Sequence, residues 1–375
     1  MRRTQLHYFW RDRSVRKRFQ SGVSLHSHTL HSKENLAFIP RYTARIPLVS
    51  TAIRQQEDRY RMLNGRQLDF SRAFWCPPLA PREAYDVERQ QLQQLGLDAL
   101  VPLSDHDDIQ AGSMLRVVDP TTPISVEWTV PFGPSFFHLG VHNLPHQRAA
   151  AIMADLAAFT SSPERGRLAE LLATLDELPE TLIVMNHPLW DESGIGAVEH
   201  AQLVGRFLER FGCHVHALEL NGFRSGRENQ RVVWLAEHSG HALISGGDRH
   251  GLEPNANVNL TNTQTFAEFV SELRQHGISD VLFMPQYHEP LRVRMIGTMC
   301  DVVREYPDLP VGRRRWNDRV FYIQQDGVAR PLSTFWQDNE PWPVKCFLGV
   351  LRAVMSRQMR AALRLALADP QEAGI

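Results

Sequence analysis

Histidines recur beside apolar runs in this chain, and the first closely spaced pair is His26 and His28 in Leu25-His26-Ser27-His28. If this stretch is a strand, both imidazoles project from the same side, because side chains alternate along a strand. Later segments repeat the arrangement of a His, with or without an Asp, at the end of an apolar run: 103–108, 185–188 and 246–250. Neutral imidazoles and carboxylates are metal ligands, so the repetition indicates a metal site.

The candidate ligands offer nitrogen and oxygen donors and no thiolate. They are His26, His28, His106, Glu127, His138, His187, Asp248 and His250, with Asp105 beside them. Such a set suits Mn, Zn or Fe(II), and a carboxylate can bridge two cations. These donors are too many for one tetrahedral ion, so we predict a site with two or three divalent metal ions. Such a site would lower the pKa of a bound water and hold the oxygens of a phosphate.

Strands and helices are predicted to alternate between these motifs. Apolar runs predict strands near 23–26, 99–103, 123–127, 136–141, 181–185, 215–220 and 242–244, and helical periodicity is clear at 152–159, 168–175 and 204–211. Such alternation favours a mostly parallel sheet with helices outside it. Because candidate ligands follow at least six strands, we predict a closed barrel, in which the carboxyl ends of the strands converge on one mouth.

The composition is that of a folded protein without a dominant charge. Of 375 residues, 41 are basic and 42 acidic, so no global field attracts nucleic acid or anionic lipid. The four cysteines are far apart and are typical of a reducing compartment. No apolar run approaches the roughly 20 residues of a transmembrane segment. We therefore expect a cytoplasmic protein, whose oligomeric state the sequence does not indicate.

Three regions are expected. Residues 1–20 predict a basic arm, either frayed and solvated or binding RNA. The predicted barrel spans 21–275 and contains an insertion at 39–81, interpreted as a lid, a subdomain or a partner surface. Residues 276–375 form a C-terminal extension that ends in an amphipathic basic helix near 344–368. That helix is expected to dock on the barrel, with an acidic partner, a phosphate backbone or membrane headgroups as the alternative.

The ordered motifs resemble those of the polymerase and histidinol phosphatase (PHP) family over about residues 21–275. They are Leu25-His26-Ser27-His28-Thr29, Ser104-Asp105-His106-Asp107, Val126-Glu127, His138-Leu139-Gly140, Asn186-His187-Pro188 and Gly247-Asp248-Arg249-His250-Gly251. The resemblance implies an α/β fold of the distorted (β/α)7 barrel type, which holds up to three metal ions and hydrolyses phosphoesters.

The resemblance also implies roles by position. The first ion would be held by His26, His28, Glu127 and Asp248. Glu127 would bridge to a second ion held by His138 and His187, and His106 and His250 would hold a third. Glu127, Asp105 and Asp248 are the expected catalytic residues, with Asp105 either orienting its neighbour or contributing a ligand. His142 is an alternative to His138.

The chain departs from the family pattern after the first motif. Many relatives have Ser-Asp-Gly where this chain has Ser32-Lys33-Glu34, and many have Asp at the position of Ser24. A charged lysine cannot coordinate a metal. Either Glu34 or His31 therefore replaces the missing carboxylate, or the third ion is weak or absent. Lys33 could contact a substrate phosphate instead.

Other substrate contacts are expected from Asn221 and Arg224, which follow a predicted strand, and from Arg249. A guanidinium can hold a phosphate with two hydrogen bonds, although each arginine could equally pair with a carboxylate at the rim.

We predict a metal-dependent phosphoric ester hydrolase, of the phosphatase or exonuclease type, that uses a metal-activated hydroxide. Its partner would be a small phosphorylated substrate or, alternatively, a short RNA or DNA end. A binuclear amidohydrolase bridged by Glu127 is a second hypothesis. No lysine lies between Lys33 and Lys345, which excludes the common version bridged by a carbamylated lysine in mid-barrel. A degenerate barrel that serves as a binding or scaffold module is the third hypothesis.

Overall fold

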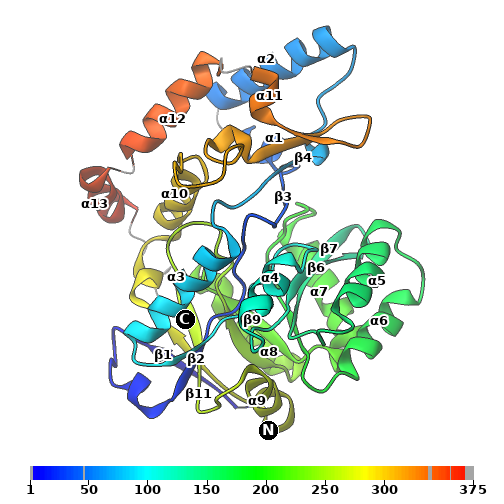
Figure 1. Ribbon diagram of the computed structural model, residues 1–375, viewed down its shortest axis with the longest axis vertical. Coiled ribbons are helices and arrows are strands. Elements are labelled where there is room, and N and C mark those ends of the chain that lie inside the picture. The colour runs from blue at the N-terminus through cyan, green and yellow to red at the C-terminus, as the bar shows by residue number, and fades with distance from the viewer. Residues whose placement is uncertain (1–2, 45–46, 337–339, 355, 368–375) are drawn as a thin grey trace.

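The computed structural model describes residues 3–44, 47–336, 340–354 and 356–367. They form an α/β fold with two mixed sheets, one small antiparallel sheet and helices packed around them (Figure 1). Sheet 1 has the order β1 (Arg3–Tyr8), β12 (Ile278–Phe283), β11 (Asn257–Thr261), β2 (Ser21–Val23), β5 (Asp98–Leu100). Sheet 2 has the order β10 (Ala242–Gly246), β9 (Ala217–Asn221), β8 (Leu182–Met185), β7 (Ser135–His142), β6 (Val126–Phe132). Sheet 3 has the order β14 (Ala329–Pro331), β13 (Val320–Ile323), β4 (Ala73–Trp75), β3 (Glu34–Asn35).

The α-helices follow in chain order. They are α1 (Ile39–Thr43), α2 (Pro47–Asn64), α3 (Pro81–Gln94), α4 (Gln110–Val118), α5 (Ala149–Ser161), α6 (Arg167–Asp176), α7 (Ala197–Phe211), α8 (Gly226–Ser239), α9 (Phe266–Ser271), α10 (Leu291–Val302), α11 (Leu332–Trp336), α12 (Trp342–Val354) and α13 (Arg357–Ala366). Short 3-10 or π turns are η1 (Val15–Arg18), η2 (Phe70–Arg72), η3 (Gly212–His214), η4 (Glu272–His276), η5 (Pro285–His288) and η6 (Trp316–Asp318). No helix in the described ranges is both long and apolar enough to cross a bilayer.

The predicted closed (β/α)7 barrel is wrong. β7 runs antiparallel to both β6 and β8, and β11 runs antiparallel to both β12 and β2. Only Gly133 and Pro134 separate β6 from β7, and Gly133 has a φ of 62°. So short a connection can only reverse the chain, because a parallel crossover needs a dozen or more residues. Isolated bridges, such as the one from Ser27 to Arg249, link the segments that follow the strands of sheets 1 and 2, and none of the described sheets closes.

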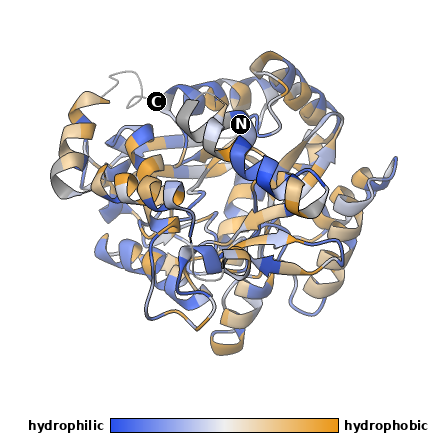
Figure 2. Ribbon diagram, turned by 90° about the horizontal axis from the view of Figure 1, so that it is seen from above, coloured by the Kyte–Doolittle hydropathy of each residue, from blue (hydrophilic) through white to orange (hydrophobic). Residues whose placement is uncertain are grey.

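The helical periodicity read from the sequence is confirmed in α5 and α6. Ile152, Leu156 and Phe159 are buried on one face of α5, and the leucines of α6 are buried likewise. They pack with Trp128 of β6 in one core, where the indole Nε1 donates to the carbonyl of Leu156. Figure 2 shows hydrophobic and hydrophilic residues mixed along the outer helices, as expected for helices with one buried face.

The N-terminal arm is part of sheet 1, so the expectation of a frayed terminus is wrong for residues 3–8. β1 pairs in parallel with β12, from Arg3 opposite Ile278 to Tyr8 opposite Phe283. The rings of Tyr8 and Phe283 stack with their centroids 5.7 Å apart. Leu6 and Tyr8 lie two residues apart, so they share the face of β1 that packs against the core.

The insertion and the C-terminal extension build sheet 3 together. β4, from the insertion, pairs with β3 on one side and with β13 of the extension on the other. Arg319, which is 2% exposed, donates to the carbonyls of Val302 and Arg304, and its own carbonyl accepts the N–H of Cys76. Sheet 3 and α1, α2 and α11 lie above sheets 1 and 2 in Figure 1.

The long C-terminal helix predicted at 344–368 is two helices, α12 and α13, and residue 368 lies outside the described ranges. The basic residues of α13 are partly docked. Arg360 lies 2.7 Å from Glu289, and Arg364 lies 2.6 Å from the same carboxylate. Two basic residues of α13 thus pair with Glu289, which precedes α10.

Candidate metal centre

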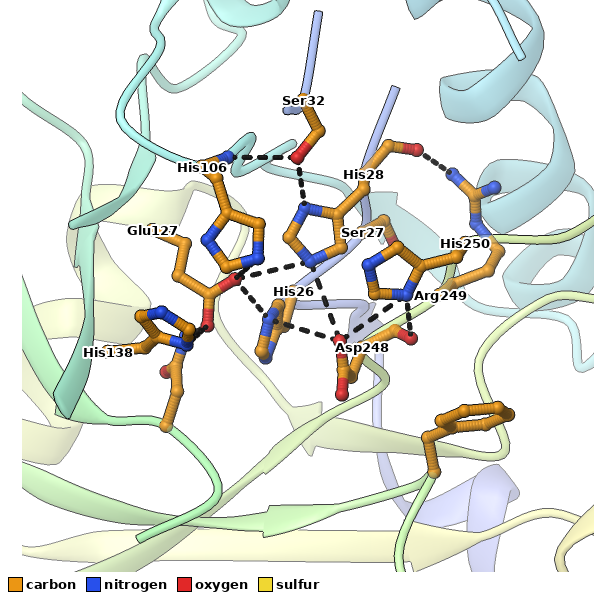
Figure 3. A network of polar contacts seen from close by, with 12 residues as sticks. His26, Ser27, His28, Ser32, His106, Glu127, His138, Asp248, Arg249 and His250 are labelled. Carbon is orange, nitrogen blue, oxygen red and sulfur yellow. Dashed lines mark hydrogen bonds and ion pairs between the residues drawn. The ribbon is translucent and has the colours of Figure 1, made fainter. Parts of the chain in front are cut away.

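Imidazoles and carboxylates from several strands and the loops after them meet in one cluster, and Figure 3 shows part of it around Glu127. They are His26 and His28 after β2, Glu34 in β3, His106 after β5, Glu127 in β6, His138 in β7, His187 after β8, Glu219 in β9, and Asp248 and His250 after β10. The parallel strands among these end at the same edge of their sheet, so the residues that follow them come together.

Glu127 lies at the middle of this cluster and is fully buried. Its Oε2 is 2.9 Å from His26 Nε2 and 3.3 Å from His28 Nε2. Its Oε1 is 3.1 Å from His187 Nε2 and accepts a hydrogen bond from Asn186 Nδ2. The two carboxylate oxygens therefore face different sets of imidazoles, which is the arrangement that a bridging ligand needs.

Within the described part of the chain, three groups of side chains have donor atoms close enough to share an ion. Within each group these atoms lie within 4.8 Å of one another. The groups are His26/His28/Glu127, His106/Glu127/His138 and His28/Glu34/His106/His250.

In each of three imidazoles, one ring nitrogen makes a hydrogen bond and the other does not. His26 Nδ1 donates to Glu219, His28 Nδ1 to Ser32 Oγ, and His250 Nδ1 to the carbonyl of Asp248. The Nε2 atoms of all three are buried and have no hydrogen-bond partner among the residues that the structure describes, and neither does Glu127 Oε2. Buried polar atoms without partners are rare and costly. Lone pairs that converge in this way fit a metal ion, because each of these imidazoles, when neutral, is fixed in the tautomer that coordinates through Nε2.

Electrostatics couple these groups. Burial favours the neutral form of Glu127, but the surrounding imidazoles, His26 first, hold its pKa well below the usual value. Burial disfavours the charged form of His26, yet Glu127 and Glu219 raise its pKa well above normal. For His138, burial dominates and lowers the pKa well below normal. The cluster is thus a set of buried carboxylate anions facing imidazoles, which also attracts divalent cations.

Backbone strain coincides with the cluster. His26, His187 and Asp248 have φ values of 63°, 26° and 53°, a region that residues other than glycine rarely adopt. Such conformations cost about 1–3 kcal/mol each and tend to occur at functional sites.

No family model and no curated protein matches the chain. Solved structures do show similarity. PsfC from Pseudomonas syringae PB-5123 is 17% identical, with 74% of this chain and 96% of that chain covered and a TM-score of 0.41. An amidohydrolase from Chromobacterium violaceum, with bound sulfate and no metal, is 15% identical over 52% of this chain and 92% of its own, with a TM-score of 0.34. A candidate metal-dependent phosphoesterase from Bifidobacterium adolescentis is 13% identical over the same shares, with a TM-score of 0.33.

Glu34, rather than His31, joins the cluster. Its Oε2 lies 3.1 Å from His250 Nε2 and 3.3 Å from His106 Nε2. Burial opposes its charge, but His250 and His106 hold its pKa well below normal. Ser32 Oγ donates to Glu34 Oε1, so the Ser32-Lys33-Glu34 segment does supply a carboxylate.

Asp105 and His142 stand outside the three groups. Asp105 accepts hydrogen bonds from the backbone N–H and the hydroxyl of Thr29, which places it as a support for the His28 loop. Burial raises the pKa of Asp105. His142 is buried behind the cluster, and burial lowers its pKa to about 3. His138 is the histidine that lies beside Glu127, with its Nδ1 3.6 Å from the carboxylate, in the ligand position predicted for either His138 or His142.

The predicted substrate contacts differ in their surroundings. Arg224 Nη2 lies 3.2 Å from Asp248, and its guanidinium stacks 4.1 Å above the ring of Trp190. Arg249 is instead engaged inside the protein, by Glu88 at 2.7 Å and by the carbonyls of Gly251 and His28.

Asn221 and Lys33 also have contacts within the protein. The amide of Asn221 donates to Glu219 Oε2 and accepts from the backbone N–H of Phe223. The ammonium of Lys33 lies 5.9 Å from the centroid of the Phe74 ring.

Glu219 and Glu192 lie in the cluster although neither was predicted from the sequence as a site residue. Glu219 lies within the apolar strand segment Ala217-Leu218-Glu219-Leu220. A carboxylate in such a segment indicates a functional or paired residue, because a buried charge needs a partner. Glu192 Oε2 lies 4.0 Å from His138 Nδ1, in the loop after His187, and burial raises its pKa. No comparable sequence signal marks Glu192.

Proposed function

We propose that this protein is a metal-dependent phosphoesterase that acts on a small phosphorylated substrate. The observation that carries the proposal is the convergence of unpartnered Nε2 atoms of His26, His28 and His250 on Glu127 and Glu34. Two or three divalent ions would be held by the three groups defined above, with Glu127 shared between them. When bound, such ions activate water as a nucleophile and stabilise charge on phosphoryl oxygens.

Arg224 would bind the phosphate. Its Nε is buried, lies 3.8 Å from Glu228 and has no hydrogen-bond partner among the described residues, and its stacking on Trp190 restricts its rotamers. A guanidinium next to Asp248 favours an anionic substrate, since it forms paired hydrogen bonds with phosphate oxygens. A Glu127-bridged amidohydrolase would need no such cation, so Arg224 favours the phosphoesterase over the amidohydrolase.

A cavity of about 300 Å³ adjoins the cluster. Asp248 and His250 line it on one side, and Gly297 and Thr298 of α10 line it on the other. This size is at the lower end for small-molecule sites. It suits the organic part of a small phosphomonoester better than a polynucleotide, and the near-zero net charge also argues against extended nucleic acid.

The test is elemental analysis followed by activity assays. Protein purified without chelator should contain Mn, Zn or Fe and should hydrolyse members of a panel of phosphomonoesters, dinucleotides and short RNAs supplemented with Mn²⁺. His26→Ala should lose both metal and hydrolysis. His238→Ala, which removes an exposed imidazole on α8, is the matched control and should lose neither. A protein that binds no divalent metal, or a His26→Ala variant with full activity at limiting metal, would contradict the proposal.

A further inference from the structure

Glu219 connects two of the loops that carry candidate ligands. It is 2% exposed, and Oε1 lies 2.6 Å from His26 Nδ1. Its Oε2 accepts the backbone N–H of His187 at 2.7 Å and the side-chain amide of Asn221 at 2.9 Å. One carboxylate on β9 thus holds the loop after β2 and the loop after β8.

The contact with His26 decides which nitrogen of that ring faces the cluster. A carboxylate can only accept a hydrogen bond, so Nδ1 must carry the proton, and Nε2, 2.9 Å from Glu127, presents its lone pair when the ring is neutral. Ser32 and the carbonyl of Asp248 do the same for His28 and His250, but they are neutral acceptors. An anionic acceptor makes the stronger hydrogen bond and a more basic imidazole.

We propose that Glu219 is a positioning residue for the metal centre, which sets the tautomer of His26 and the turn at His187 without itself touching an ion. The inference rests on the proposed function, since it assumes that His26 binds metal. It is consistent with the strained backbone at both contacts, where φ is 63° at His26 and 26° at His187. A fixed hydrogen bond at each strained residue offsets part of the cost of that conformation.

The Glu219 carboxylate packs directly against the backbone of Gly246, which leaves no room for a side chain at that position. A Cβ atom at Gly246, which neighbours Asn221 across the β9–β10 pair, would lie 1.6 Å from Glu219 Oε1. No positive φ is required at Gly246, so its backbone would accept alanine. Gly246→Ala would therefore displace the Glu219 carboxylate from His26 while leaving the candidate ligands unchanged.

The experiment is a titration of metal-free protein with Co²⁺, followed by its visible absorption bands, which report both affinity and ligand geometry. Glu219→Ala should weaken Co²⁺ binding by about 10- to 100-fold, the usual effect of losing an outer-shell partner of a metal-bound His. Glu219→Gln retains an acceptor oxygen without the charge, so it should restore part of the affinity. The control is Asp176→Asn, which removes a carboxylate that contacts His214 and His216 before the start of β9. It should bind Co²⁺ as the wild type does.

A double-mutant cycle tests the mechanism. Gly246→Ala should lower Co²⁺ affinity in the wild-type background but have little further effect with Glu219→Ala, because the displaced carboxylate is then already absent. Additive effects of the two changes would overturn the inference, and so would wild-type affinity in Glu219→Ala. If Glu219→Ala does not fold, Gly246→Ala and Glu219→Gln still decide the question. Wild-type protein that fails to bind Co²⁺ refutes the proposed function itself, whereas wild-type binding with an unchanged Glu219→Ala variant refutes the role of Glu219 alone.

Discussion

Glu34 lies opposite Trp75 in the antiparallel β3–β4 pair, and the indole of Trp75 lies 5.6 Å from the imidazole of His250, measured between ring centroids. β4 also pairs with β13, so the C-terminal extension supports the strand pair that carries Glu34. The candidate metal centre is therefore completed by a sheet whose strands come from both halves of the chain.

Glu34→Gln should reduce the metal content of the protein. The change removes the carboxylate of the His28/Glu34/His106/His250 group and leaves the other two groups unchanged. We expect about one ion fewer per chain at limiting metal, because charged oxygen ligands contribute strongly to the affinity for divalent ions. Elemental analysis after dialysis against graded chelator measures the loss. Lys33→Gln, at the exposed neighbouring position, is the control, and equal metal content in the two variants would exclude Glu34 as a ligand.

Arg224→Gln should impair hydrolysis without removing metal. Hydrogen bonds to charged groups are worth about 1.5–3 kcal/mol, so kcat/KM for a phosphomonoester should fall by about 10- to 100-fold. Arg231→Gln, at an exposed position on α8, should leave the rate unchanged. Steady-state kinetics and metal analysis of the same preparations separate the two effects. Loss of metal in Arg224→Gln would mean that the guanidinium serves mainly to hold Asp248.

Arg249→Met should destabilise the fold. It breaks the buried pair with Glu88 and leaves that carboxylate without its cation, which typically costs about 3–5 kcal/mol. Urea unfolding of the metal-free protein measures the change in the free energy of unfolding. The double variant Glu88→Gln/Arg249→Met should recover part of it, because no uncompensated charge remains. If Arg249→Met were as stable as the wild type but inactive, Arg249 would contact substrate after all.

The contribution of Asp176 to stability should depend on pH. Burial alone would raise its pKa, but hydrogen bonds from His216 and His214, together with Arg274, lower it below the usual value. A depressed pKa means that the ionised carboxylate stabilises the native state above the unfolded-state pKa of about 3.9 and that this stabilisation is lost as the pH falls through the lower native pKa. The difference in free energy of unfolding between wild type and Asp176→Asn should therefore be largest near neutrality and shrink below about pH 4. A difference that stayed constant down to pH 3 would show that charge is not its source.

The failure of the predicted barrel traces to one short connection and one inserted strand. Gly133-Pro134 lies between two apolar runs, and so short a link forms a hairpin. The antiparallel β6–β7 pair could therefore have been predicted from the sequence. The antiparallel entry of β11 between β12 and β2 had no local signal, because pairing direction depends on contacts between segments far apart in the chain.

By itself, the sequence determined the chemistry available to this protein: imidazoles and carboxylates at the ends of apolar strands, and the helical faces of α5 and α6. Those features depend on residue type and on periodicities within a few residues. Only the tertiary structure decided that Glu34 approaches His106 and His250, that Arg249 turns to Glu88, and that Glu219 reaches His26. Each of these contacts joins residues from different elements, and only packing of the whole chain brings such residues within hydrogen-bond distance.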